Sequence, residues 1–339
     1  MRRTVGARLV IFVGLVTILA ACGGATSAGT DPTANDLPGG PAGSIEVSGS
    51  STVEPITALV QEAFASANPS VGISVEGPGT GDGFARFCAG ETSVTDASRP
   101  IKASEAETCS AAGIEYVELQ IAFDGLTVLT SPENAAIGCL DYHDLYALLG
   151  PESEGFDTWA DADTLAAELG ATHAPYPDVP MVVTAPGEES GTFDTFAELV
   201  IADIAEGRGA DVTTRPDYSP EANDNVIVNN LSTNPTSLGW VGFAFFVENA
   251  DMVKAIEIDG GAGCVNPSVE SIADGSYPLA RPLFIYVKTN DLATNTALID
   301  FIDFYLSDDG IANVSKAGYV ALPDDLLNAA RSAWESASS

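Results

Sequence analysis

The sequence predicts an α/β fold with two globular domains, on the strength of three observations. Segments with the two-residue periodicity of strands alternate with segments of helical periodicity from Ser44 onward. The chain has 339 residues, of which 45% are hydrophobic and 18% charged, so it can build more than one apolar core. Two predicted strands lead into helices through turns rich in serine, threonine and glycine, a pattern typical of α/β proteins that bind ligands at this junction.

The first 21 residues have the layout of a secretory signal peptide. Arg2, Arg3 and Arg8 precede an apolar run over residues 9–20, and small residues then lead directly into Cys22. This junction resembles a bacterial lipobox, in which the cysteine is lipidated and becomes the new N-terminus. The alternative is an ordinary signal peptide whose cleavage site happens to precede a cysteine.

Residues 22–43 have no periodic pattern and are rich in Gly, Ala, Thr, Pro, Ser and Asp, which predicts a flexible tether. No segment after the signal peptide approaches the ~18 uninterrupted apolar residues of a membrane-spanning helix. We therefore expect an extracytoplasmic protein that is anchored to the cell membrane by lipid at Cys22 and is otherwise soluble.

The chain is strongly acidic, with 13 basic and 48 acidic residues and a formal net charge of −35 at pH 7. Loss of the signal peptide removes three arginines and no acid, so the mature chain is more acidic still. This balance argues against a nucleic-acid partner, because the basic clusters that neutralise phosphates are missing. A small anion would also be repelled at long range, so an anion site has to rely on short hydrogen bonds in an enclosed pocket.

Residues 48–56 read as a strand that enters a helix through a hydroxyl-rich turn. Ser51 and Glu54 have the spacing of a capping box, and Pro55 suits the first turn of a helix. Two interpretations stay open. Ser51 caps the helix, or Ser51 and Thr52 turn their hydroxyls outward and form an oxyanion site with the free first-turn amides.

Three later segments carry groups that bind anions. The glycine-rich turn 77–83 allows the backbone to pass close to a ligand with its amides exposed, although it is neither a dinucleotide-binding fingerprint nor a P-loop. The alternative is a tight turn that binds no ligand. Residues 95–102 place a hydroxyl beside Arg99, whose guanidinium can hold an oxyanion with two hydrogen bonds; the alternative for Arg99 is a surface salt bridge. Residues 186–193 form a second hydroxyl-bearing turn between a strand and a helix.

The remaining periodic segments complete the alternation. Strands are expected over residues 45–47, 71–75, 117–130, 181–185 and 277–287, and helices over residues 56–64, 142–149, 193–204, 297–306 and 323–334, with a further helix that begins near Ser104. Residues 238–246 are expected in the core. The acidic stretch 159–169 receives no assignment.

With Cys22 assigned to lipid, four cysteines remain, and an even number in an exported chain predicts two disulfides. Of the three pairings we prefer Cys88 with Cys109, which flank one structural unit, and Cys139 with Cys264, which would join the ends of a long excursion. We expect no metal site, because the sequence has no CxxC and neither of its two histidines, His143 and His173, has a partner at ligand spacing.

Five segments together resemble the phosphate-binding proteins of bacterial phosphate ABC transporters. In chain order they read GSSTVEP at 49–55, GPGTGDGF at 77–84, DASRPIK at 96–102, ESGTFDTF at 189–196 and YPLARPLFIYV at 277–287. The resemblance covers the chain after residue 44 and implies a type II periplasmic-binding fold, in which two lobes, each a mixed sheet flanked by helices, are joined by two crossover strands and close on the ligand. It places residues 44–130 plus 278–339 in lobe 1 and residues 131–277 in lobe 2.

The resemblance also implies a set of phosphate ligands. These are Ser51, Thr52, Thr80, Ser98, Arg99, Ser190, Gly191 and Thr192. The chain departs from the family at two positions: many relatives have an arginine where this chain has Pro186, and some have an aspartate where it has Arg99. Asp96 or Asp82 is then the candidate acceptor for the proton of monohydrogen phosphate, a group that fully ionised sulfate lacks.

We therefore expect a monomeric receptor that needs no cofactor, captures inorganic phosphate and delivers it to an ABC permease. A receptor for another tetrahedral oxyanion, such as sulfate, molybdate or a phosphonate, is the first alternative. An exported phosphate-ester hydrolase is the second. Against it, Ser190 lies in the sequence GEESG and not in the nucleophile elbow G-x-S-x-G.

Overall fold

A ten-stranded mixed sheet runs through residues 43–339, the part of the chain that the computed structural model describes. The predicted signal peptide, Cys22 and residues 22–42 of the tether lie outside the described residues. Gly43, which we assigned to the tether, is the first residue of β1. Among residues 43–339, no helix combines the length and the apolar character needed to cross a bilayer.

The large sheet has the strand order β2-β1-β3-β12-β4-β8-β6-β7, and β13 and β9 also pair with β4. Its strands are β1 (Gly43–Ser48), β2 (Val71–Glu76), β3 (Val94–Ala97), β4 (Tyr116–Thr130), β6 (Val182–Pro186), β7 (Ser219–Glu221), β8 (Ser237–Gly242), β9 (Lys254–Ala255), β12 (Ala280–Lys288) and β13 (Val320–Ala321). A smaller sheet contains β5 (Cys139–Asp141), β10 (Glu257–Asp259) and β11 (Cys264–Val265).

Helices cover both sheets. They are α1 (Glu54–Ala67), α2 (Thr80–Cys88), α3 (Ala103–Ala111), α4 (Tyr142–Leu149), α5 (Asp163–Leu169), α6 (Gly191–Phe196), α7 (Ala202–Arg208), α8 (Asp224–Thr233), α9 (Phe243–Glu248), α10 (Val269–Ala273), α11 (Thr296–Tyr305), α12 (Asp308–Lys316) and α13 (Asp324–Ser338). The described part of the chain also has three short 3-10 helices, η1 (Pro151–Ser153), η2 (Trp159–Ala162) and η4 (Thr289–Asp291). A π-helical turn, η3 (Ala197–Ile201), joins α6 to α7.

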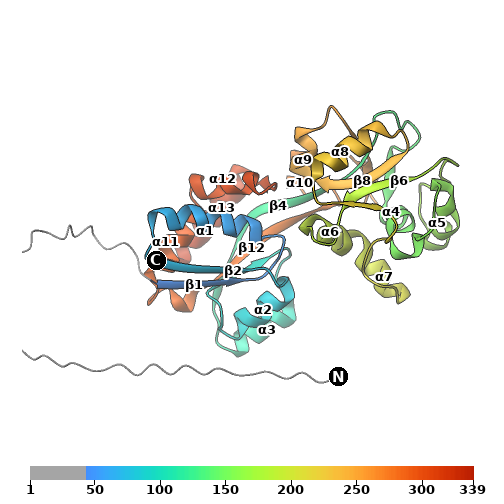
Figure 1. Ribbon diagram of the computed structural model, residues 1–339. Helices are drawn as coiled ribbons and strands as arrows, with labels where there is room; N and C mark the ends of the chain where they lie inside the picture. Colours follow the sequence, from blue (N-terminus) through green and yellow to red (C-terminus); the bar gives the residue numbers. More distant parts are fainter. Residues whose placement is uncertain (1–42) are drawn as a thin grey trace, which may run out of the picture. The chain divides into compact units, whose positions relative to one another are not determined.

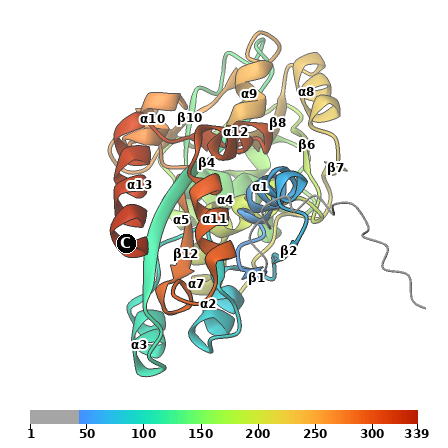
Figure 2. The same ribbon diagram turned by 90° about the vertical axis from the view of Figure 1, so that its left-hand side faces the viewer.

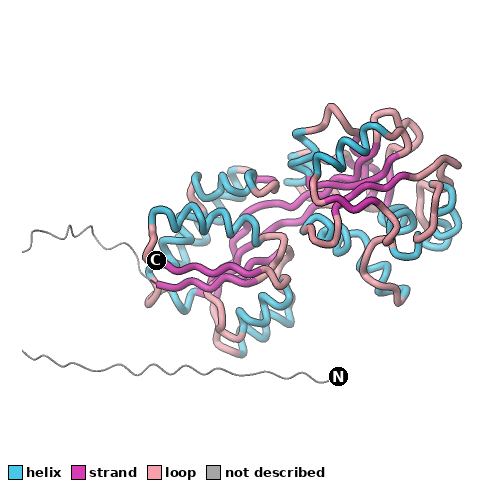
Figure 3. Tube along the Cα trace, viewed as in Figure 1, coloured by secondary structure: helices cyan, strands magenta, loops and turns pink. Residues whose placement is uncertain are grey.

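Strands β4 and β12 connect two groups of elements. The first ten residues of β4 pair antiparallel with β12, whereas its last five pair with β8 and β9. Figures 1 and 3 show the two strands running from a group that contains β1, β2 and α1 to a group that contains β6, β8 and α4. The predicted two-lobed α/β fold is therefore confirmed. The lobe boundaries at residues 130 and 278 remain a prediction.

The first lobe packs helices on both faces of β1, β2 and β3. Helix α1 buries Ile56, Val60 and Phe64, members of the apolar stripe that its sequence predicts. The other face carries α2 and α3, where the ring of Phe84 packs edge-on against Tyr286 of β12. Figure 2 shows α13 lying along β4. This lobe thus holds the N-termini of α1 and α2 at one end of its parallel strands.

The second lobe is built on β6, β7 and β8, which run parallel to one another. Phe196 of α6 stacks on Trp240 of β8, with ring centroids 4.2 Å apart, and both side chains are fully buried. This contact fixes α6 against the sheet. The acidic stretch 159–169, which we left unassigned, forms η2 and α5 and buries Trp159.

Most predicted elements match the structure within a few residues. The return strand 277–287 begins only at Ala280, because Tyr277 and Pro278 lie in the preceding turn. Residues 238–246, which we expected in the core, split into the buried strand β8 and helix α9, whose later phenylalanines are only half-buried.

Both predicted cysteine pairs form disulfides, Cys88 with Cys109 and Cys139 with Cys264. The first is buried between α2 and α3. The second joins β5 to β11, the two strands that flank β10 in the smaller sheet. The preferred pairing is therefore confirmed.

Candidate anion-binding site

A pocket of about 290 Å³ opens between the first lobe and one face of α6 and η3. It is lined by Ser50, Ser51, Thr52, Pro78, Gly79, Thr80, Ser98, Phe193, Asp194, Ala197, Glu198 and Val212. Four of the eight predicted ligands, Ser51, Thr52, Thr80 and Ser98, therefore lie together. They come from three separate strand-to-helix connections of the first lobe.

The turn before α1 presents its hydroxyls to the pocket. Helix α1 begins at Glu54 with Val53 at the N-cap position, and no side chain caps it, so the capping box that we considered is not formed. Ser50 organises the turn instead: its carbonyl accepts the amides of Val53 and Glu54, and its Oγ accepts the amide of Thr52. Ser51 is thereby free to donate across the pocket to Asp194 Oδ2, at 3.5 Å.

The N-terminus of α2 supplies the next group. Thr80 Oγ1 lies 3.1 Å from Ser98 Oγ and accepts the Ser98 amide at 3.2 Å. The N-cap residue is Gly79, whose φ of 113° suits only glycine, and it offers no side-chain cap. The first amides of α2 have no acceptor within the helix, and they carry the positive end of its dipole. This end of the pocket therefore favours negative charge.

Two carboxylates of the second lobe face these donors. Asp194 and Glu198 lie one turn apart on α6 and η3, and both side chains reach solvent. Partial desolvation raises the pKa of Asp194, and the neighbouring Glu198 raises it further, while Ser51 and Arg281 oppose the shift. Asp194 therefore holds a proton more tightly than an ordinary aspartate does.

Arg281 is the important residue that the sequence interpretation missed. It stands opposite Asp124 in the β4–β12 pair and is only 9% exposed. Its guanidinium donates to Thr52 Oγ1 at 3.0 Å, to Thr195 Oγ1 at 2.9 Å and to Asp124 Oδ2 at 3.3 Å. It also pairs with Glu198. The available signal was a charge inside the otherwise apolar strand 277–287.

Arg99 does not line the pocket. Its guanidinium makes two hydrogen bonds to Glu105, at 2.9 and 2.7 Å, and lies 5.6 Å from the centroid of the Phe84 ring. This is the salt bridge that we considered as the alternative. A role for Arg99 as a ligand remains a prediction that requires it to leave Glu105.

The two candidate proton acceptors also lie away from the pocket. Asp82 is exposed on the first turn of α2. Asp96 is fully buried in β3, and burial raises its pKa to about 7, with the Thr57 hydroxyl opposing the rise and Glu54 adding to it. Among residues 43–339, neither carboxylate oxygen of Asp96 has a hydrogen-bond partner in normal geometry. Asp96 is thus a core residue, not part of the pocket lining.

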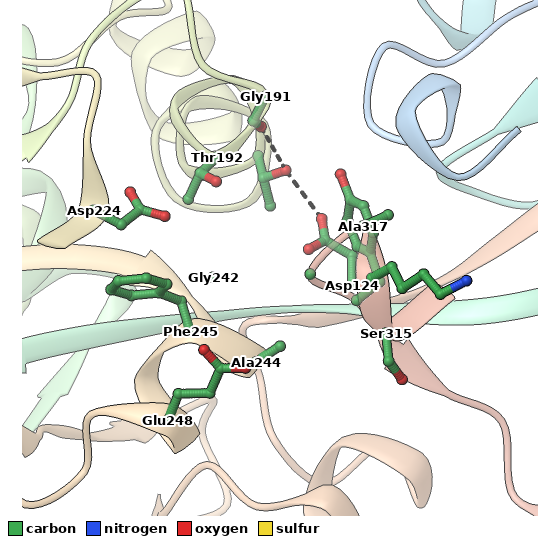
Figure 4. Close-up of a pocket in the computed structure, with 14 residues that line it drawn as sticks. Asp124, Gly191, Thr192, Asp224, Gly242, Ala244, Phe245, Glu248, Ser315 and Ala317 are labelled. Atoms are coloured by element: carbon green, nitrogen blue, oxygen red, sulfur yellow. Dashed lines mark hydrogen bonds between the residues drawn. The ribbon is translucent and has the colours of Figure 1, made fainter. Parts of the chain in front are cut away.

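The predicted ligands on α6 lie at its N-terminus. Ser190 is the N-cap residue, and its Oγ accepts the Thr192 amide at 3.2 Å. Gly191 and Thr192 line a neighbouring pocket of about 260 Å³, which Figure 4 shows between them and the segment containing Ser315 and Ala317. Asp124, Asp224 and Glu248 make that pocket acidic. Thr195, whose Oγ1 lies 3.0 Å from both Gly191 O and Asp124 Oδ2, also lines this second pocket.

Two lobes on a pair of connecting strands, with a hydroxyl-lined pocket at helix N-termini, define the class of two-lobed solute-binding proteins. Residues 25–309 match the family model of the PBP superfamily domain. The protein SphX from Synechocystis is 38% identical over 286 residues, 84% of this chain and 80% of that protein. The phosphate-binding protein PstS from Staphylococcus haemolyticus is 35% identical over 316 residues, 92% of this chain and 90% of that protein.

A solved structure agrees with these relatives. The crystal structure of a possible phosphate binding protein from Planctomyces limnophilus has a TM-score of 0.80 at 36% identity and covers 88% of this chain and 99% of its own. The chain therefore belongs to the phosphate-binding protein family of the PBP superfamily. This confirms the family that the five motifs indicated.

Proposed function

We propose that this protein captures inorganic phosphate in the pocket between α1, α2 and α6 and delivers it to an ABC permease. The observation that carries the proposal is the convergence of four hydroxyls, from Ser51, Thr52, Thr80 and Ser98, opposite the carboxyl group of Asp194. Lipidation at Cys22 would hold the receptor at the outer face of the cell membrane, beside the permease. The phosphate-binding relatives support this function.

The pocket chemistry suits monohydrogen phosphate. Its oxygens would accept hydrogen bonds from the four hydroxyls and from the first amides of α2, which are short-range contacts that work in spite of the acidic surface. Arg281 holds Thr52 in place and brings a positive charge beneath the site. The O–H group of the phosphate would donate a hydrogen bond to the Asp194 carboxylate. Asp194 would then be the proton acceptor, the role for which we first named Asp96 or Asp82.

Asp194 would also explain discrimination against sulfate. Fully ionised sulfate has no proton to donate, so its oxygen would face the Asp194 carboxylate without a hydrogen bond. The cost is electrostatic repulsion in a partly desolvated pocket, where charges are poorly screened. Other tetrahedral oxyanions without a proton should be rejected for the same reason.

Closure of the lobes would complete the site. The hydrogen bond from Ser51 to Asp194 is 3.5 Å long, and each lobe supplies only part of the binding groups. An anion that contacts both lobes would therefore favour a closed arrangement. We expect closure to bring Ser190, Gly191 and Thr192, at the N-terminus of α6, toward the anion.

A hydrolase is not favoured by the geometry at Ser190. The Ser190 hydroxyl accepts the Thr192 amide as a helix cap, whereas His173 is bonded to Asp144. A nucleophile needs a general base within hydrogen-bond reach, and neither contact provides one. The PstS relative is a phosphate-binding protein, which agrees with a function in capture and not in turnover.

Isothermal titration of the protein without its lipid anchor, with phosphate and then with sulfate, tests the proposal. At about pH 8 we expect tight binding of phosphate and no heat from sulfate, because monohydrogen phosphate can donate a hydrogen bond to the Asp194 carboxylate and sulfate cannot. Asp194→Asn should weaken phosphate binding and narrow the difference between the two anions. Equal binding of phosphate and sulfate by the unmodified protein would contradict the role of Asp194 as a proton acceptor. Binding of neither anion would contradict the proposed function in phosphate capture.

A further inference from the structure

A second cluster of reactive side chains lies in the other lobe, apart from the anion pocket. Cys139 of β5 and Cys264 of β11 meet in a disulfide, and His173, which follows α5, stands beside them. The two sulfur atoms and a ring nitrogen of His173 all lie within 4.8 Å of one another. His173 Nε2 is 3.7 Å from Cys264 Sγ.

The other ring nitrogen of His173 is held by a buried acid. Nδ1 lies 2.7 Å from Oδ2 of Asp144, whose side chain is fully buried at the start of α4. Asp144 is itself fixed, because its carboxylate accepts the Tyr176 hydroxyl and the Asp141 amide. When Nδ1 donates to Asp144, the lone pair of Nε2 points to the sulfur atoms. Histidines that bind metals are oriented by a carboxylate in this way.

We propose that reduction of the Cys139–Cys264 disulfide converts this cluster into a zinc site, with two thiolates and His173 Nε2 as ligands and the fourth position open to water. Zn–S bonds of about 2.3 Å and Zn–N bonds of about 2.0–2.1 Å, at tetrahedral angles, place sulfur and nitrogen about 3.6 Å apart. The observed 3.7 Å between Nε2 and Cys264 Sγ already matches this spacing. Only the two sulfur atoms have to move apart.

The chemical step requires a two-electron reductant, such as a dithiol. The dithiol donates two electrons to the disulfide, the S–S bond breaks, and the dithiol is oxidised to its own disulfide. The two cysteines then bind Zn²⁺ as thiolates and release two protons to solvent. The metal would replace the covalent link between β5 and β11, so the small sheet would stay tied together in either redox state.

Exposure selects this disulfide over the other one. Cys264 is exposed and Cys139 half-buried, so a reductant and a metal ion can reach them. Cys88 and Cys109 are 2% and 0% exposed, and the contact found for their sulfur atoms is with the carbonyl of Glu105. The chain thus contains its own control pair of cysteines.

Metal titration of the purified protein tests the proposal, with Co²⁺ as the spectroscopic probe for zinc. After reduction with a phosphine, which contributes no competing thiol, we expect one Co²⁺ per chain and a sulfur-to-cobalt charge-transfer band. His173→Asn should weaken binding by about tenfold or more. His143→Asn is the matched control, because His143 is exposed and lies outside the cluster, and it should bind as the unmodified protein does.

A second measurement does not depend on any variant. In the reduced protein, Zn²⁺ should slow alkylation of Cys139 and Cys264 by about tenfold or more and leave Cys88 and Cys109 unchanged, as mapped by mass spectrometry. If reduction alone perturbs the fold, Zn²⁺ should restore the circular dichroism spectrum. Alkylation rates that are the same with and without Zn²⁺, or Co²⁺ binding that survives His173→Asn undiminished, would overturn the proposal.

Discussion

Arg281 shows how one buried cation joins several segments of the chain. It reaches Thr52 from the first lobe, Asp124 from the neighbouring strand and Thr195 from α6, so it links the anion pocket to both lobes. Burial alone would lower the pKa of Arg281, but Asp124 and Glu198 raise it above the ordinary value, so the charge is permanent. A buried charge of this kind has to keep its partners, because an unpaired ion in the core is costly.

Replacing Arg281 should therefore affect phosphate binding more than replacing Arg99. We expect Arg281→Met to weaken binding by more than tenfold, because Thr52, which lines the pocket, loses the charged group that donates to it. Arg99→Met should have a smaller effect, since Arg99 already pairs with Glu105. Titration calorimetry with phosphate on both variants, at a temperature where circular dichroism shows them folded, would test this order. A larger loss of phosphate affinity in Arg99→Met would mean that Arg99 is a phosphate ligand.

Asp96 should make stability fall as pH rises. Burial raises its folded pKa to about 7, so the folded state holds the proton more tightly than the unfolded state does. The stabilisation is complete below the unfolded pKa of about 3.9 and is lost as pH rises through about 7. Asp96→Asn cannot ionise, so at about pH 8 it should exceed the unmodified protein in free energy of unfolding by at most about 4 kcal/mol.

Urea unfolding at about pH 4 and about pH 8 would test this prediction. The quantity compared is the difference in free energy of unfolding between Asp96→Asn and the unmodified protein, because the contributions of the other acidic residues cancel in this difference. We expect a small difference at the lower pH and a large one at the higher pH. The same difference at both values would mean that Asp96 is not protonated in the folded state.

At the scale of elements, the glycine-rich segment brings α2 close to the turn after β1. A Cβ atom added to Gly83 would lie 2.5 Å from the Cα of Gly49 and 2.7 Å from Thr95 Oγ1. The sequence predicted a close backbone approach to a ligand, and the structure shows that Gly83 approaches another part of the backbone. That approach brings the N-terminus of α2, with Thr80, to the pocket.

Gly83→Ala should consequently weaken phosphate binding, because the added methyl group pushes α2 away from the hydroxyls of the turn. Gly81→Ala is the matched control, since a Cβ there has no atom within 4 Å and lies on the same helix. Alanine also favours a helix over glycine by roughly 0.8–1 kcal/mol, so the control should be as stable as the unmodified protein or slightly more so. Calorimetric titration and thermal unfolding of both variants would check this. Equal affinities would show that α2 accommodates the methyl group.

At the scale of the whole molecule, the dominant feature is the strong negative charge, which affects both lobes. The excess of 48 acidic over 13 basic residues produces repulsion that disfavours the compact state. Cations that lie close to acids, such as Arg215 beside Asp217 and Arg208 beside Glu152, relieve this repulsion only locally. Solution ions have to screen the rest.

Salt should therefore stabilise the protein. Raising NaCl from about 0.01 M to about 1 M shortens the Debye length from about 30 Å to about 3 Å, and we expect the Tm to rise by several degrees. The increase should shrink at about pH 4, where many of the carboxylates are protonated. Scanning calorimetry at both pH values gives the comparison. A Tm that does not change with salt at neutral pH would show that the charge is already balanced by local pairs.

The local sequence pattern by itself determined the secondary structure, several turns and the choice of cysteine pairs. Apart from Thr80, which only the family resemblance indicated, the alternation of strands and helices, helix α4, strand β4, the hydroxyl turns with Ser51, Thr52 and Ser98, and the preferred disulfide pairs were predicted from the residues themselves. These features depend on periodicity, turn chemistry or the small number of cysteine pairings, which involve near neighbours or a short list of choices.

Only the tertiary structure decided the rest. Asp194 lies opposite Ser51, Arg281 touches Thr52, and His173 stands between Asp144 and Cys264, although each pair is separated by many residues along the chain. Asp96 and Arg99 belong to a recognised motif, yet the first side chain is buried in the core and the second is paired with Glu105. Residue type and spacing state which chemistry a side chain can perform. Which partners it meets depends on how distant segments pack, and that information is not contained in any local pattern.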